Sequence, residues 1–130
     1  MADEIVWLLK EAVRAVHSRQ ISEHGGRPGI RDEGLLLSAL ARPQNLAAYG
    51  DPPPDLAALA ASYAYGIARN HPFVDGNKRV ALVAARTFLL INRADLVASQ
   101  EEKYVTFLRL AEGQLNEDEL AGWIRKHLKH

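Results

Sequence analysis

Nine consecutive residues near the middle of the chain combine side chains that together could transfer a phosphoryl group. Residues 71–79 read His-Pro-Phe-Val-Asp-Gly-Asn-Lys-Arg. His71 can accept a proton near neutral pH, because its imidazole titrates in that range. Asp75 offers the carboxylate oxygens that Mg²⁺ prefers, and Arg79 carries a permanent charge with a forked donor geometry suited to phosphate. These residue types in this order predict a phosphoryl- or nucleotidyl-transfer site.

The residues that follow predict how this segment is held. Val80, Ala84 and Phe88 recur at helical spacing, so a helix should begin directly after the nine residues. Gly76 and Asn77 would then lie where a loop turns into a helix N-terminus. Exposed N–H groups and the positive end of the helix dipole attract anions at such a junction. The sequence therefore predicts an anion-binding loop.

Each of these residues alone also has an ordinary structural explanation. His71 could be a core imidazole bonded to backbone, Asp75 could form an Asx turn, and Arg79 could be a solvated helix residue. The ordered combination, placed directly before a periodic helix, favours the functional interpretation.

The same segment resembles the signature of the Fic/Doc superfamily, His-x-Phe-x-Asp/Glu-Gly-Asn-Gly/Lys-Arg. Lys78 stands where AMP-transferring Fic enzymes carry glycine, and Leu82 stands where they tend to carry a second arginine. These two residues, with the runs at 25–36 and 42–44, resemble the Doc (death-on-curing) branch. The resemblance extends from about residue 16 to residue 93.

The resemblance implies a role for each site residue. His71 would be the general base that takes a proton from a hydroxyl of a protein substrate, and Asp75 would bind Mg²⁺. The nucleotide phosphates would be held by four consecutive residues, Gly76, Asn77, Lys78 and Arg79. Lys78 and Arg79 would also be catalytic. Asn77 would orient the loop or donate to a phosphate oxygen. Arg69 and Asn70 are secondary candidates because they abut the loop.

By the same resemblance, the chain would be a Doc-like toxin of a toxin–antitoxin pair. It would transfer the γ-phosphate of ATP to a threonine of elongation factor Tu and inhibit translation. The alternatives are AMP transfer to a protein hydroxyl, against which Lys78 and Leu82 argue, and a mainly noncatalytic antitoxin-binding module. No segment near either terminus matches the inhibitory helix motif of some Fic proteins. Inhibition of the toxin should therefore come from a separate antitoxin chain. A helix of that antitoxin would bind in an apolar groove of the toxin, whose walls would be the N-terminal helix and the Gly-Gly region.

Composition bounds the remaining possibilities. A chain of 130 residues that is 48% hydrophobic suits one compact domain with a real core. Lys plus Arg equals Asp plus Glu at 16 each, which gives no support for nucleic-acid binding. The absence of cysteine excludes disulfides, thiolate catalysis and cysteine zinc sites. The N-terminus lacks a secretory pattern and no apolar run approaches membrane-spanning length, so we expect a soluble cytoplasmic protein.

Apolar residues at helical spacing predict a single all-α domain over residues 1–130, in which the motif loop leads into a central buried helix. Asp3 and Glu4 would start the first helix. Asp32 would cap a second, short helix that Pro43 ends, and Asp55 would cap a third that leads into the motif.

Two further helices are expected towards the C-terminus. The apolar positions of the first are Tyr104, Phe107, Leu108 and Ala111. A short strand around residues 96–97 is the one strand expected, and residues 126–130 are expected to be solvated. Arg79, Arg86 and Arg93 recur every seven residues and are expected to form a solvated stripe.

Overall fold

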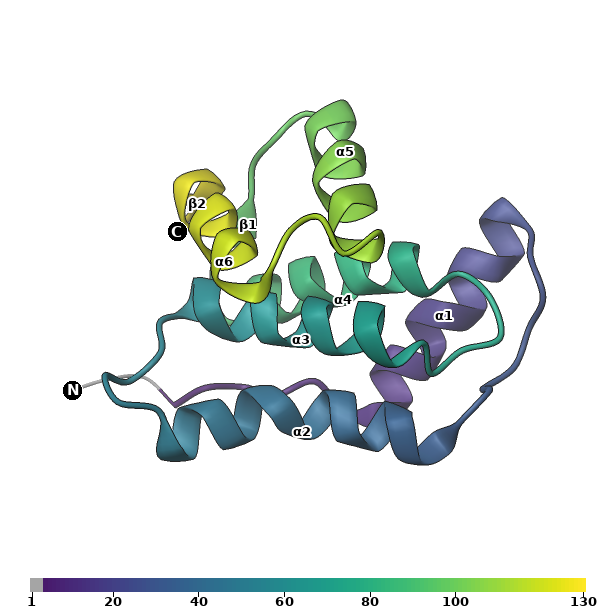
Figure 1. Cartoon of the computed structure of the whole chain (residues 1–130), viewed down its shortest axis with the longest axis horizontal. Coiled ribbons are helices and arrows are strands. Elements are labelled where there is room, and N and C mark those ends of the chain that lie inside the picture. The colour runs from purple at the N-terminus through teal and green to yellow at the C-terminus, as the bar shows by residue number, and fades with distance from the viewer. Residues whose placement is uncertain (1–3) are drawn as a thin grey trace.

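The computed structural model describes residues 4–130, which form six helices and one short pair of strands. In chain order these are α1 (Lys10–His24), α2 (Glu33–Tyr49), α3 (Leu56–Asn70), α4 (Asn77–Ile91), β1 (Asp95–Leu96), α5 (Gln100–Ala111), α6 (Glu117–His127) and β2 (Leu128–Lys129). Figure 1 shows α3 and α4 at the centre, with α2 below them, α1 at the right, and α5 and α6 above. The predicted all-α fold is confirmed.

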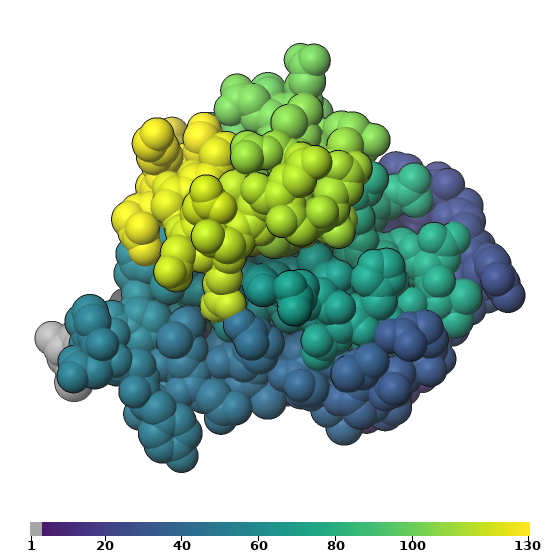
Figure 2. Space-filling model, in the orientation of Figure 1, coloured from purple at the N-terminus to yellow at the C-terminus, as the bar shows by residue number. Residues whose placement is uncertain are grey.

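The central pair of helices forms the core. Asp55 caps α3 as predicted, because its carboxylate accepts a hydrogen bond of 2.9 Å from the Ala58 N–H. The Tyr63 ring of α3 meets the Phe88 ring of α4 with centroids 5.0 Å apart, and both side chains are fully buried. Burying a large apolar side chain contributes roughly 1.5–3 kcal/mol, so this contact fixes how the helices carrying the motif lie. The side chains of α5 and α6 cover one side of this pair (Figure 2).

The N-terminal helix begins later than the apolar spacing predicts. The backbone before α1 is extended, and its polar groups bond to side chains of the central helices. The Val6 N–H donates to Asn92 Oδ1 and the Val6 carbonyl accepts from Asn92 Nδ2, both at 2.9 Å. The Leu8 N–H donates to the Tyr63 hydroxyl at 3.1 Å. These bonds replace those that a helix would supply. Asp3, the predicted start, lies outside the described residues.

The second helix does not end at Pro43. Asp32 caps α2 as predicted, but the helix continues through the proline to Tyr49. Pro43 is buried, and Leu46, one turn beyond it, packs against the core. The prediction was wrong because packing on both sides of Pro43 outweighs the roughly 3 kcal/mol that an interior proline costs a helix.

Part of the C-terminal tail belongs to the fold: Lys126, Lys129 and His130 are exposed as expected, but His127 and Leu128 are half-buried. The predicted short strand exists one residue earlier, at β1, and pairs antiparallel with β2, which places Leu96 opposite Leu128. The Val97 N–H also donates to the His127 carbonyl at 2.8 Å. Arg86 is exposed, as the predicted solvated stripe requires, and it also forms an ion pair of 3.0 Å with the β1 carboxylate of Asp95. Within residues 4–130, no helix is long and apolar enough to cross a bilayer.

Candidate functional site

The nine-residue motif lies where α3 ends and α4 begins, and two left-handed residues shape its loop. His71 terminates α3 with φ 49° and ψ 54°, and Gly76 precedes α4 with φ 81°. Histidine is among the side chains enriched in this left-handed region, whereas glycine enters it without a steric penalty. The loop therefore places the imidazole at one end and opens the helix N-terminus at the other.

The segment that precedes α2 pairs with the motif loop. The Val74 N–H donates to the Gly29 carbonyl at 3.0 Å, and the Arg31 N–H donates to the Pro72 carbonyl at 2.7 Å. These bonds make a short antiparallel bridge between Ile30 and Phe73. The Gly-rich run that resembled Doc proteins in sequence is thus the support of the motif loop.

The Arg31 side chain holds the end of α3. Its Nε donates to the His71 carbonyl at 2.7 Å and its Nη2 donates to the Asn70 carbonyl at 2.8 Å. A cation at these carbonyls also complements the negative end of the helix dipole. The sequence predicted no role for Arg31, because its partners are backbone carbonyls 40 and 39 residues away that carry no sequence signal.

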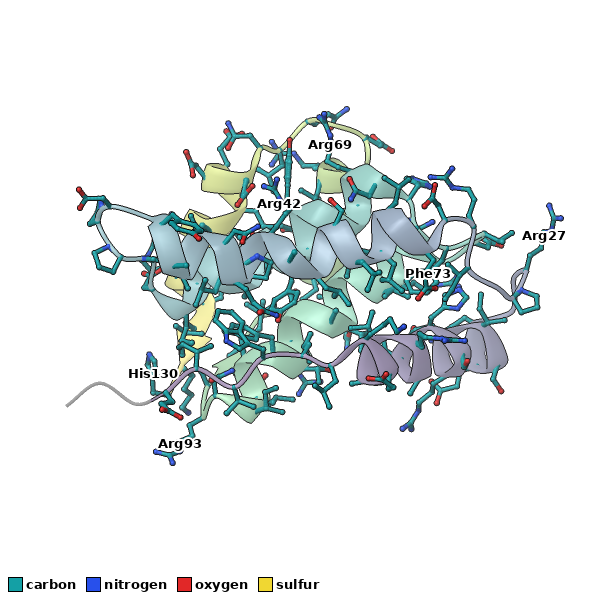
Figure 3. All side chains as sticks on the ribbon, turned by 90° about the horizontal axis from the view of Figure 1, so that it is seen from below. Arg27, Arg42, Arg69, Phe73, Arg93 and His130 are labelled. Carbon is teal, nitrogen blue, oxygen red and sulfur yellow. The ribbon has the colours of Figure 1, made fainter. Side chains whose placement is uncertain are left out.

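Phe73 and His17 anchor the loop to α1. Phe73 is only 1% exposed and points into the body of the molecule (Figure 3). Its ring stacks on the buried imidazole of His17 with centroids 4.1 Å apart. His17 Nε2 also donates to the Asp75 carbonyl at 2.9 Å. Phe73 therefore anchors the loop in the core, and His17 is a packed residue that ties Phe73 and Asp75 to α1.

Asn77 orients the loop from inside. Its side-chain oxygen accepts from the Phe73 N–H, and its Nδ2 donates to the Phe73 carbonyl, both at 3.0 Å. The same Nδ2 lies 3.2 Å from Nδ1 of His71 and donates to it in the imidazole tautomer that carries its proton on Nε2. Asn77 is 5% exposed. Because these contacts occupy its amide, its geometry favours the orienting role over donation to a phosphate oxygen.

Asp75 presents an ionised carboxylate on the exposed side of the loop. It accepts from the backbone N–H groups of Arg27 at 3.2 Å and Gly76 at 2.9 Å. These two bonds, with the Arg79 charge nearby, hold the pKa of the Asp75 carboxyl below its usual value. The bond to Gly76 has the local character of an Asx contact. Each oxygen keeps further acceptor capacity, so the structural and ligand roles are compatible.

A cavity of about 360 Å³ lies between the motif loop, the start of α4 and α5. Its walls are Ala68, His71, Val74, Asp75, Gly76, Asn77, Lys78, Arg79, Leu108 and Ala111. All the primary site residues predicted from sequence therefore meet around one space. The two α5 residues were expected only as apolar positions of a helix, and sequence gave no sign that they line the cavity.

The first turn of α4 is left open towards this cavity. Within the described chain, no side chain caps α4, whereas Asp32, Asp55, Ser99 and Asn116 cap α2, α3, α5 and α6. The N–H groups of an uncapped first turn are available to an anion.

The two secondary candidates point elsewhere. Asn70 donates to the Leu35 carbonyl at 3.0 Å, which ties α3 to α2. The Arg69 guanidinium lies 5.5 Å from the Tyr65 ring centroid, and Arg42 lies 5.2 Å from the same centroid. Figure 3 shows both arginines on the same edge of the molecule. They line a separate cavity of about 170 Å³, so adjacency in sequence to His71 did not bring them into the motif cavity.

A metal at this site would depend on ligands from a bound substrate. Within residues 4–130, no group of three or more His, Cys, Asp or Glu side chains could hold a metal ion. A single ionised carboxylate, Asp75, fits Mg²⁺ that is bound mainly through substrate phosphates and water.

Comparison with known proteins agrees with this geometry. The Fic/DOC family model matches residues 7–89. A protein kinase doc from Escherichia phage P1 is 34% identical over 116 residues, which cover 89% of this chain and 90% of that protein. The chain belongs to the Fic/DOC family. A toxin Doc from Mycolicibacterium smegmatis is 50% identical over 74 residues, and that match spans 57% of each chain. The resemblance to the Doc branch is confirmed.

The Fic/DOC match stops within α4. The motif, its Gly-rich support and α1 fall inside the matched residues, whereas α5 falls outside them. The α5 wall of the cavity is therefore described by this structure and not by the family model.

Proposed function

We propose that this Fic/DOC chain is a Doc-type toxin that transfers the γ-phosphate of ATP to a protein hydroxyl. The observation that carries the proposal is one cavity in which a base, a carboxylate, two cations and an uncapped helix N-terminus meet. The name of the phage relative, a protein kinase, supports phosphate transfer to protein. We propose a threonine of elongation factor Tu as the acceptor, so that translation stops in the cytoplasm.

The residues of the cavity suit an in-line displacement. The His71 imidazole takes the proton of the target hydroxyl, whose oxygen attacks the γ-phosphorus. The bond from that phosphorus to the ADP oxygen then breaks, which leaves a phosphorylated protein and ADP. Lys78, Arg79 and the first N–H groups of α4 stabilise the charge on the phosphate oxygens.

Asp75 is the residue that would hold Mg²⁺ in this reaction. It is ionised at neutral pH and keeps free acceptor capacity beside the cavity. When bound, the ion would neutralise and orient the phosphates.

Lys78 favours phosphate transfer over AMP transfer. Lys78 lines the cavity beside Arg79, at a position where glycine would leave room for more of the nucleotide. Leu82 supplies no second cation one turn further along α4.

The experiment is incubation of the purified chain and elongation factor Tu with ATP labelled in the α or the γ position, followed by intact-mass measurement. We expect γ label and the mass increase of one phosphate, with neither appearing for His71→Ala. Transfer of α label would establish the AMP alternative and overturn the kinase assignment. Equal growth inhibition by His71→Ala would support the noncatalytic alternative.

We also propose that an antitoxin restrains the chain by placing a helical segment in an apolar groove. The proposed walls remain the N-terminal segment with α1 and the Gly-Gly region. Two apolar side chains of the extended N-terminal segment, Val6 and Leu9, are exposed. An antitoxin segment that folds into a helix on binding could bury these two side chains, and the buried apolar surface would favour the complex.

A further inference from the structure

Lys78 has an aromatic neighbour on α5. Its ammonium nitrogen lies 4.8 Å from the ring centroid of Tyr104, within the range of a cation–π contact. The apolar spacing of α5 predicted Tyr104 as one of its apolar positions. The side chain is instead 57% exposed, and the buried face of α5 comprises Lys103, Thr106, Phe107 and Leu110. Core packing therefore does not explain where this ring lies.

The ring stands in line with the α5 wall of the motif cavity. Leu108 and Ala111 line that cavity, and they follow Tyr104 by four and seven residues on α5. Residues at this spacing share one face of a helix. Tyr104 thus lies one turn before the α5 residues that line the cavity, and Lys78, which lines the cavity from α4, contacts its ring. The described residues offer the Tyr104 hydroxyl no hydrogen bond, so the cation is the ring's specific contact.

We propose that Tyr104 is a positioning residue that holds the Lys78 ammonium at the cavity mouth, ready for nucleotide phosphates. The inference rests on the proposed function. A lysine carries its charge on a flexible four-carbon stem, and ordering that stem on binding costs conformational entropy. A ring that restrains the ammonium beside the cavity removes part of this cost before the nucleotide arrives.

The contact itself is tested without nucleotide. The ε-methylene protons of Lys78 are measured by NMR in the wild type, in Tyr104→Phe and in Tyr104→Leu. Because the lysine lies over a ring, its ε-methylene resonance should be shifted upfield in the wild type and in Tyr104→Phe, and should return to the ordinary position in Tyr104→Leu. An ordinary position in the wild type would overturn the proposal.

The function of the contact is tested by a double-mutant cycle on nucleotide binding. The probe is the non-hydrolysable ATP analogue adenylyl imidodiphosphate with Mg²⁺, titrated by calorimetry. Tyr104→Leu should weaken binding about two- to fivefold, the size of an exposed cation–π contact, whereas Tyr104→Phe should stay near wild type. In a Lys78→Ala background, Tyr104→Leu should have no further effect. Val105→Ala, at the adjacent exposed position, is the matched control and should leave the dissociation constant unchanged.

Three results would overturn the positioning role. They are unchanged or tighter binding by Tyr104→Leu, the same loss in the absence of Lys78, and loss of binding in Tyr104→Phe. Thermal melting of each variant checks that folding is intact. The mass of the product formed by the wild type separates the failure of the proposed phosphate transfer from the failure of the proposed role of Tyr104. Transfer of AMP would refute the kinase assignment but would leave the double-mutant cycle on nucleotide binding valid. A wild type that binds no nucleotide would overturn both.

Discussion

At the scale of single residues, Asn77 connects the fold to the chemistry. Its buried amide satisfies both backbone groups of Phe73 and lies against the His71 ring. We expect Asn77→Ala to lower the free energy of unfolding by about 1–3 kcal/mol, because the buried Phe73 groups lose their partner. Transfer should fall at least about tenfold, because a tilted imidazole loses its alignment with the hydroxyl. Denaturant unfolding and the transfer assay measure the two effects.

The matched control for this prediction is Asn70→Ala. The Asn70 amide bonds to the Leu35 carbonyl outside the motif cavity. Its loss should cost about 1 kcal/mol of stability and leave the transfer rate within about twofold of wild type. If the two alanine variants lost activity equally, Asn77 would have no special connection to His71.

Gly76 allows a second residue-scale prediction with a close control. Gly76 and Gly113 have nearly the same left-handed φ, 81° and 77°, but only Gly76 borders the cavity. Alanine at either position should lower the free energy of unfolding by about 1–2 kcal/mol, because a Cβ strains this backbone. Only Gly76→Ala should also weaken binding of the ATP analogue, since the strained loop shifts the first N–H groups of α4. Equal affinity of the two variants would argue against a phosphate at this helix start.

At the scale of elements, Asp55 joins α3 to α6. It caps α3 and forms an ion pair with Arg125 of α6 at 2.6 Å. Asp55→Ala should lower the free energy of unfolding by about 1–2 kcal/mol, mainly from the lost cap. Asp55→Asn keeps a capping oxygen and loses only an exposed ion pair, so it should cost no more than about 1 kcal/mol.

The pH dependence of this element follows from the same ion pair. The hydrogen bond from Arg125 lowers the pKa of the Asp55 carboxyl below its usual value in the folded protein. A lowered folded-state pKa stabilises the fold at pH values above the unfolded-state pKa, and the benefit is lost as the pH falls through the folded-state pKa. The stability difference between wild type and Asp55→Asn should therefore be present at neutral pH and shrink in acid. A difference that grew on acidification would contradict this assignment.

At the scale of the whole molecule, the motif cavity is open to solvent. The surface proposed for the antitoxin is a different one, formed by the N-terminal segment, α1 and the Gly-Gly region. We therefore expect the purified chain to be active alone. Addition of its antitoxin should protect the amides of residues 5–16 from hydrogen exchange, while those of α5 exchange as before. Full inhibition of the isolated chain, or protection confined to α5, would refute this arrangement.

The sequence by itself determined those features that depend on neighbouring residues. Helical spacing and capping side chains predicted the elements around Asp32 and Asp55, and the ordered motif from His71 to Arg79 predicted a loop-to-helix junction. These inferences were correct because caps, left-handed glycines and apolar stripes act within one or two turns of the chain.

Only the tertiary structure decided features whose partners are distant in sequence. The backbone before α1 is extended because Asn92 and Tyr63 supply its hydrogen bonds, and α2 runs through Pro43 because α3 packs beside it. The Arg31 clamp on the motif loop and the Tyr104 ring beside Lys78 likewise had no local signal. Each of these contacts depends on how separate helices pack. A side chain or carbonyl that finds its partner on another helix produces no local pattern in the sequence.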